Sequence, residues 1–182
     1  QRQLGAARRF NAIHDNALFA SLSEDQKHRL AEQSEDISLA PGQTFCRQGD
    51  AGDSLFLLIS GSVSILAAGA DGRERHVGEV HAGGDGSFFG ELSAMTGHPR
   101  AATVRAQTDV TAIEITRADL QDIFASDPTL LDHFARIIAQ REREQSEHLR
   151  RSGAQENENQ SQTTSQTSVL DRMKRLFASR HR

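Results

Sequence analysis

The stretch FFGELSAMTGHPRAATVRA, residues 88–106, carries the most specific information in the chain. Gly90 tolerates backbone angles that other residues avoid and lets a ligand approach the backbone closely. The apolar run that follows, through Met95, is long enough for about one helical turn, whose first N–H groups have no partner within the helix. Such a helix start favours an anion, because its free donors and its dipole both attract negative charge.

Two charged side chains complete this stretch. Glu91 follows Gly90 directly, and Arg100 comes after a turn at residues 97–99 that ends the short helix. A guanidinium matches phosphate oxygens with two parallel hydrogen bonds, whereas a carboxylate accepts hydrogen bonds from a sugar hydroxyl. The stretch therefore predicts a site for a phosphorylated ribose. The alternative is a surface hairpin in which both charged side chains are simply solvated.

The segments FGEL (residues 89–92) and PRAATV (residues 99–104), with the spacing between them, resemble the phosphate-binding cassette of cyclic nucleotide-binding domains. The resemblance implies that Glu91 accepts a hydrogen bond from the ribose 2′-hydroxyl and that Arg100 pairs with the cyclic phosphate. Backbone N–H groups nearby would complete the anion site. The ligand-binding residues predicted in this way are Gly90, Glu91, Leu92, Ser93, Arg100 and Ala101.

Size and composition are those of one domain with attached segments. The chain has 182 residues and a net charge of −4, which gives no general attraction to nucleic acid. No apolar run is long enough to span a membrane, and no signal peptide opens the sequence. Because the first residue is Gln1 rather than methionine, we expect a fragment of a longer protein, although tag removal or processing would look the same.

The cysteine and histidine residues form no reactive or metal-binding pattern. Cys46 is the only cysteine, which excludes an internal disulfide and suggests a reducing, cytoplasmic setting. His76 and His81 are the closest pair of histidines and have no cysteine nearby. No nucleophile with an adjacent base accompanies Glu91 and Arg100. We therefore predict no metal site, no catalytic residue and no enzyme activity.

Short apolar segments separated by glycine turns dominate residues 37–116. Residues 54–60 are apolar enough for a strand buried on both faces, and residues 62–65 alternate as in a half-buried strand. About eight strands at this spacing predict an α+β fold with an eight-stranded antiparallel β-barrel or jelly roll. The family that the cassette resembles has such a barrel. Turn residues 41–42, 48–50, 52–55 and 60–61 resemble its framework, so the resemblance covers residues 18–150.

Helical patterns flank the strands. Residues 4–19 have apolar side chains at helical spacing, and Ser23 is expected to cap a second helix that ends before Asp36. After the strands, residues 117–124 form one amphipathic pattern and Asp127 caps a longer one. By resemblance these are the B helix and the C (lid) helix. The polar end of the lid, residues 140–144, either contacts a purine or is a solvated or pairing face.

The predicted boundaries divide the chain into five segments. A helical segment (1–36) precedes the barrel (37–116), which contains the cassette (88–106), and the B and C helices (117–151) follow. Residues 152–168 are polar and are predicted to be a disordered linker. Residues 169–182 are predicted to form a basic amphipathic helix that contacts a membrane surface, a partner helix or the same domain, or else a disordered tail. Residues 81–87 are longer and richer in glycine than in the family, which is either harmless or alters ligand entry.

These features predict a sensor in which a cyclic nucleotide moves the lid helix. In relatives that prefer cyclic GMP a threonine often follows the cassette arginine, whereas this chain has Ala101, so we expect a preference for cyclic AMP. No helix-turn-helix follows the lid and no second cassette is present. The pattern resembles the cytosolic tail of a bacterial cyclic nucleotide-regulated, mechanosensitive-like channel at the inner membrane, which would form homo-oligomers through a pore that precedes Gln1. The alternative is a free-standing adaptor with a protein or membrane partner.

Overall fold

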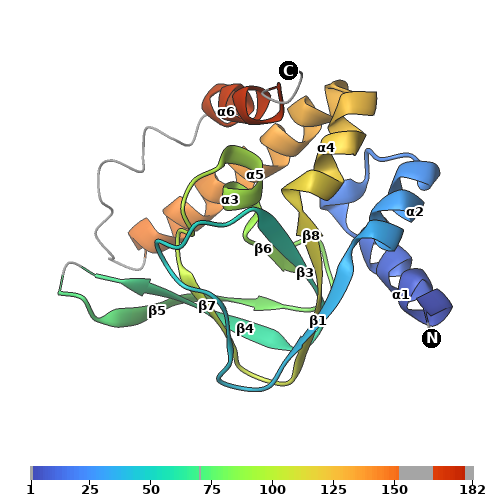
Figure 1. Ribbon diagram of the computed structural model, residues 1–182. Coiled ribbons are helices and arrows are strands. Elements are labelled where there is room, and N and C mark those ends of the chain that lie inside the picture. The colour runs from blue at the N-terminus through green and yellow to red at the C-terminus, as the bar shows by residue number, and fades with distance from the viewer. Residues whose placement is uncertain (1, 70, 152–165, 179–182) are drawn as a thin grey trace. The chain divides into compact units, whose positions relative to one another are not determined.

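The computed structural model describes residues 2–69, 71–151 and 166–178. The chain divides into two compact units, Gln1–Ile123 and Phe124–Arg182. The first unit contains the N-terminal helices and two antiparallel four-stranded sheets (Figure 1). The second unit contains the later helices. No helix in the described ranges is both long enough and apolar enough to cross a membrane.

The N-terminal segment forms α1 (Arg2–His14), the short 3-10 helix η1 (Ala17–Phe19) and α2 (Glu24–Gln33). Ser23 caps α2, because its hydroxyl accepts from the backbone N of Gln26 at 3.2 Å while the Gln26 side chain accepts from Ser23 N at 2.8 Å. The two predicted helical regions and the Ser23 cap are thus confirmed. Figure 1 shows α1 and α2 beside the sheet that contains β1 and β8.

Eight strands form the two sheets. The first sheet has the order β1-β8-β3-β6 and the second has the order β2-β7-β4-β5, and every pair is antiparallel. The first strand starts at Glu35, earlier than the predicted residue 37, because Ser34 is already extended and Glu35 pairs with Glu114. The strands are β1 (Glu35–Leu39), β2 (Thr44–Cys46), β3 (Ser54–Ser60), β4 (Ser62–Ala68), β5 (Glu74–His81), β6 (Phe88–Phe89), β7 (Thr103–Ala106) and β8 (Val110–Thr116).

The predicted antiparallel strands with flanking helices are confirmed, but the closed barrel is not formed by these pairings. Among the described residues, no ladder joins one four-stranded sheet to the other. Two packed sheets of four strands correspond to a double-sheet jelly roll, which was the other form that the sequence predicted. The spacing of apolar segments in a sequence counts strands, whereas closure depends on which strands become partners. This pairing is a long-range property that the spacing does not contain.

The core lies between the two sheets, and β3 is buried on both of its faces, as predicted. Its residues Phe56 and Leu58 join the apolar cluster between the sheets, whereas Leu55 and Leu57 are buried outside that cluster, and α1 lies against the strand. Burying each such side chain contributes about 1.5–3 kcal/mol. The other buried members of the cluster are Val63, Val80, Phe89, Val104, Ala106, Val110 and Ala112.

Helix α4 (Arg117–Ser126) starts in the first unit, and α5 (Thr129–Arg151) belongs to the second. The side chain of Asp127 accepts from the backbone N of Thr129 at 3.1 Å, which confirms the predicted cap. The predicted polar end of α5 shows a pairing contact, since Gln140 Nε2 donates to Glu144 Oε1 at 3.0 Å. Buried residues of α5 recur at helical spacing, as expected for one apolar face: Leu130, Leu131, Phe134, Ala135, Ile138 and Ala139.

Helix α6 (Gln166–Ala178) packs within the second unit. It contacts α5, its Val169 and Met173 are fully buried, and Phe177 meets Phe124 edge-on with ring centroids 4.8 Å apart. Of the partners that the sequence left open, the structure thus shows the chain's own helices. The prediction of a disordered linker was wrong for residues 166–168, because α6 begins at Gln166. These polar residues form the first turn of the helix. Residues 152–165 and 179–182 lie outside the described residues.

Candidate functional site

Helix α3 (Glu91–Thr96) lies between two glycines in the left-handed conformation. Gly90 has φ 81° and ψ 2°, and Gly97 has φ 76° and ψ 9°, angles that strain any residue with a side chain. The backbone N of Gly97 donates to Ser93 O at 3.0 Å and closes the helix. The predicted short helix and its break at residue 97 are therefore confirmed. Its first turn offers backbone N–H groups that lie outside the helical ladder.

The structure brings the predicted site residues together around the start of α3. Glu91 and Ser93 are buried, Leu92 is half-buried and Ala101 is exposed. Arg100 is only 6% exposed, and its Nη1 donates to the carbonyl oxygen of Gly90 at 3.1 Å. The guanidinium thus lies beside the N-terminal end of α3. The role of each residue in binding a ligand stays a prediction.

Arg100 is held by neutral oxygens. Nη1 also donates to Ser54 O at 2.6 Å, and Nη2 donates to the hydroxyl of Ser54 at 3.2 Å. The backbone around Arg100 is fixed as well, because its N donates to Asp50 O and its O accepts from Gly49 N, both at 2.8 Å. Its Nε has no hydrogen-bond acceptor within the described part of the chain. A buried cation with an unused donor is suited to an anionic ligand.

Two neighbours leave the Arg100 side chain little freedom. A Cβ on Gly52 would lie 2.8 Å from Nη2 and would overlap with Nε and Cζ, so only glycine accommodates the guanidinium here. On the other side, Cζ lies 5.6 Å from the centre of the Phe56 ring, within the range of a cation–π interaction. Sequence reasoning assigned Gly52 to the framework turns but not to the position of Arg100.

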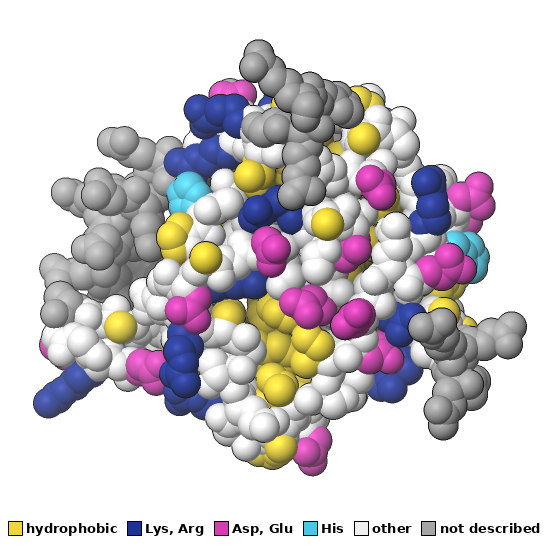
Figure 2. Space-filling view, in the orientation of Figure 1, with side chains coloured by type: hydrophobic (Ala, Val, Ile, Leu, Met, Phe, Trp, Pro, Cys, Tyr) yellow, Lys and Arg dark blue, Asp and Glu magenta, His cyan; other side chains and the backbone are white. Residues whose placement is uncertain are grey.

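Aromatic side chains extend the site toward the space between the sheets. The rings of Phe45, Phe56 and Phe89 contact one another, with centroids 5.1–5.2 Å apart. Figure 2 shows hydrophobic side chains reaching the surface below α3, between the sheets, with charged side chains around them. Half-buried apolar residues adjoin the cluster at Ile37, Leu39, Phe45, Cys46, Ile65 and Ala82. A polar anion site therefore borders an apolar surface.

A second arginine, which the sequence reasoning missed, holds the other end of α3. The side chain of Arg117 donates from Nε to Ala94 O at 2.8 Å and from Nη2 to Ser93 O at 2.9 Å. Nη2 also donates to Gly52 O at 3.2 Å. A cation at the first position of a helix interacts unfavourably with that helix's dipole. The position of Arg117 at the start of α4 could therefore have indicated that its side chain binds elsewhere. Its charge instead stabilises the C-terminal end of α3.

Cys46 lies close enough to Arg100 for that cation to affect the pKa of the thiol. Burial raises the pKa of the Cys46 thiol, and the nearby Arg100 cation opposes that rise. The sulfur is 3.9 Å from the carbonyl oxygen of Ala102. The thiol is therefore largely protonated at neutral pH, which agrees with the prediction of an unreactive cysteine.

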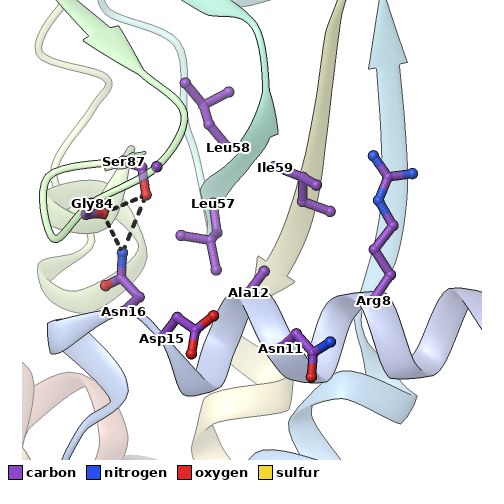
Figure 3. A pocket seen from close by; sticks show the side chains of 11 residues that line it. Arg8, Asn11, Ala12, Asp15, Asn16, Leu57, Leu58, Ile59, Gly84 and Ser87 are labelled. Carbon is purple, nitrogen blue, oxygen red and sulfur yellow. Dashed lines mark hydrogen bonds between the residues drawn. The ribbon is translucent and has the colours of Figure 1, made fainter.

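A cavity of the first unit lies away from these residues, between α1, β3 and the loop before β6 (Figure 3). Its volume is about 290 Å³. Buried Asn16 closes one side, donating from Nδ2 to Gly84 O at 3.4 Å and to Ser87 Oγ at 3.3 Å. The glycine-rich loop is thus anchored on the N-terminal segment. In the described ranges, no group of three or more His, Cys, Asp or Glu residues is arranged to hold a metal ion.

Comparison with known proteins identifies the family. The model of the cyclic nucleotide-binding domain matches residues 36–127, which include the strands and the cassette. A cAMP-dependent protein kinase regulatory subunit of Blastocladiella emersonii is 32% identical over 95 residues, which are 52% of this chain and 23% of that protein. A cyclic nucleotide-gated potassium channel of Mesorhizobium japonicum is 34% identical over 100 residues, which are 55% of this chain and 25% of that protein.

Among solved structures, the N-terminal domain of a transcriptional regulator from Streptomyces coelicolor is similar. It is 29% identical with a TM-score of 0.59, and the match covers 76% of this chain and 94% of that one. The chain spans about a quarter of the length of the kinase subunit and of the channel. The family match covers half of the chain, including both charged residues of the site. The chain therefore belongs to the cyclic nucleotide-binding domain family.

Proposed function

We propose that this chain is a sensor that binds cyclic AMP in the cassette around α3 and has no enzymatic activity. The ribose 2′-hydroxyl donates to Glu91, and the cyclic phosphate pairs with Arg100. Backbone N–H groups near Gly90, Leu92, Ser93 and Ala101 complete the phosphate site. The family match supports the ligand class, and the position of each residue around α3 supports this assignment.

One observation carries the proposal: a guanidinium that is 6% exposed lies at the N-terminal end of a helix and, among the residues that the structure describes, forms no carboxylate pair. Burying a cation is costly unless its donors are used. The dipole of α3 and the charge of Arg100 both favour an anion at the same place. A cyclic phosphate supplies that anion, and the apolar surface beside it suits the sugar and base.

Cyclic AMP is the proposed ligand and cyclic GMP the weaker one. Residue 101 follows the arginine and is an exposed alanine, which offers no hydroxyl to the guanine amino group. The relative from Blastocladiella emersonii is named as cAMP-dependent. Ligand binding then recruits the lid helix α5, and the polar residues 140–144 are the proposed contacts to the purine. A ligand shifts the lid only by the difference between its affinities for the two lid positions.

The proposed output is regulation of a transmembrane pore in the same polypeptide, at the inner membrane of a bacterium. The similarity to a cyclic nucleotide-gated potassium channel supports this output. In this case the pore brings several copies of the domain together. The alternative is a free-standing adaptor that acts through a protein or membrane partner. The fact that a kinase subunit and a transcriptional regulator are also similar favours a module used with different effectors.

Calorimetric titration of the ligand-free chain with cyclic AMP and cyclic GMP tests the binding. We expect one saturable site with tighter binding of cyclic AMP. Arg100→Ala should weaken binding by about tenfold or more, since it removes a charge-assisted contact worth about 1.5–3 kcal/mol. Arg105→Ala is the matched control, because Arg105 of β7 forms an ion pair with Glu74 of β5 at the protein surface. Equal affinities of both variants, each folded, would exclude Arg100 as the phosphate contact.

A further inference from the structure

We propose that Arg117 is a positioning residue that connects the cassette helix α3 to α4, so that ligand binding at Arg100 is passed to α4. The inference rests on the proposed cyclic nucleotide binding. It concerns how the site is joined to the helix that leads toward the lid. Arg117 is outside the cassette and would not touch the ligand.

The two arginines hold opposite ends of one short helix. Arg100 donates to the carbonyl oxygen of Gly90 at the start of α3, and Arg117 donates to the carbonyl oxygens of Ser93 and Ala94 in its last turn. Because α3 has only six residues, its two ends move together. A shift of Arg100 toward a phosphate would therefore reach the donors of Arg117 through the helix itself.

Both arginines also share a second anchor, the segment 52–54. Arg100 donates to Ser54 O and Ser54 Oγ, while Arg117 donates from Nη2 to Gly52 O and from its backbone N to Asp53 O at 2.6 Å. The Cα of Gly52 packs against the Arg100 guanidinium, on the side where a side chain would be. Two continuous sets of contacts thus join the arginines, one through α3 and one through residues 52–54.

The backbone of Arg117 is rigidly fixed to α4. The side chain of Asp119 accepts from both the backbone N and the hydroxyl of Thr116, at 2.7 Å each, and Asp119 N donates back to Thr116 Oγ1 at 3.2 Å. This is a reciprocal cap at the start of the helix. A displacement of the Arg117 side chain therefore moves the first turn of α4 rather than a loose connection.

Amide hydrogen exchange, followed by NMR on the whole chain with and without saturating cyclic AMP, tests the inference. In the wild-type protein we expect slower exchange with ligand both in α3 and in residues 120–123 of α4. In Arg117→Gln the ligand should still slow exchange in α3 but not in α4, and the affinity should fall by about 2- to 30-fold. Arg75→Gln is the control, since Arg75 is exposed and pairs with Asp71.

The alternative outcomes are distinguishable. Ligand-induced protection of α4 that persists in Arg117→Gln would overturn the inference and leave the binding proposal intact. If the wild-type protein binds neither nucleotide, the proposed function fails. The connection between α3 and α4 through Arg117 is then tested by amide hydrogen exchange without ligand. Arg117→Gln must then accelerate exchange at Gly97 and in residues 120–123 together, and an unchanged pattern would overturn it. If Arg117→Gln does not fold, Arg117→Lys keeps the charge but loses the fork that bridges α3 and Gly52.

Discussion

Gly52→Ala should displace Arg100 without removing it. The added Cβ overlaps with Nε and Cζ of the guanidinium, which is the far end of a flexible side chain and can move away. The backbone itself tolerates alanine, since residue 52 has no positive φ. The variant therefore separates the position of the cation from its presence, which Arg100→Ala does not.

The expected magnitude follows from the contacts that are lost. A displaced guanidinium no longer reaches the phosphate, and a charge-assisted hydrogen bond contributes about 1.5–3 kcal/mol. This corresponds to a rise in Kd for cyclic AMP of about ten- to 150-fold. The carbonyl oxygen of Ser54 also loses its donor from Arg100, at a cost of about 1–3 kcal/mol of unfolding free energy. The smaller unfolded-state entropy of alanine offsets about 0.4–1 kcal/mol of that cost.

Calorimetry with cyclic AMP and urea unfolding are the two assays. Gly78→Ala is the matched control, because a Cβ at Gly78 meets no atom within 4 Å and its φ is not positive. The control should keep the wild-type affinity. A folded Gly52→Ala protein that binds cyclic AMP as tightly as the wild type would refute the reasoning, since the cation would then be either movable at no cost or not in contact with the phosphate.

Three further predictions concern selectivity, pH dependence and the C-terminal helix. Ala101→Thr should improve cyclic GMP binding in calorimetry with little change for cyclic AMP, because residue 101 is exposed and the hydroxyl is accommodated; no improvement would count against the proposed selectivity. Burial raises the pKa of Cys46, so its contribution to stability is fully present below the unfolded thiol pKa of about 8.5 and is lost as pH rises through the folded value. The difference in urea midpoint between wild type and Cys46→Ala should thus shrink as the pH rises above the unfolded thiol pKa of about 8.5, and a constant difference would contradict it. Met173→Ala should weaken the packing of α6 by about 2–5 kcal/mol and speed amide hydrogen exchange within it, unlike Lys174→Ala at an exposed position, and equal exchange rates in the two variants would argue against the packing.

Local features of the site could be predicted from the sequence. Gly90 and Gly97 adopt the left-handed angles that only glycine takes easily, and a short helix lies between them. The Ser23 cap and the buried strand β3 likewise follow from neighbouring residues. Each of these depends on residues only a few positions apart, which is the range over which patterns in one sequence are informative.

The features that could not be predicted from the sequence depend on contacts between residues far apart in the chain. Ser54 lies 46 positions before Arg100, and Gly52 lies 65 positions before Arg117, so no local pattern shows that the two arginines share the same segment. The division into two sheets rather than one barrel is also set by strand partners. The position of α6 was left open for the same reason, since an amphipathic helix shows one apolar face but not what covers it.

The neutral partners of Arg100 have a consequence for how an anion arrives. In a chain with net charge −4, an arginine whose partners among the described residues are all carbonyl and hydroxyl oxygens keeps its full positive charge. An incoming phosphate thus displaces no carboxylate and is attracted from a distance. Association should therefore slow as ionic strength rises, because ions screen the attraction over about 10 Å at 0.1 M salt. For the same reason, inorganic phosphate or sulfate competes for the cation, and affinities measured in phosphate buffer will be weaker than those in a buffer without such anions.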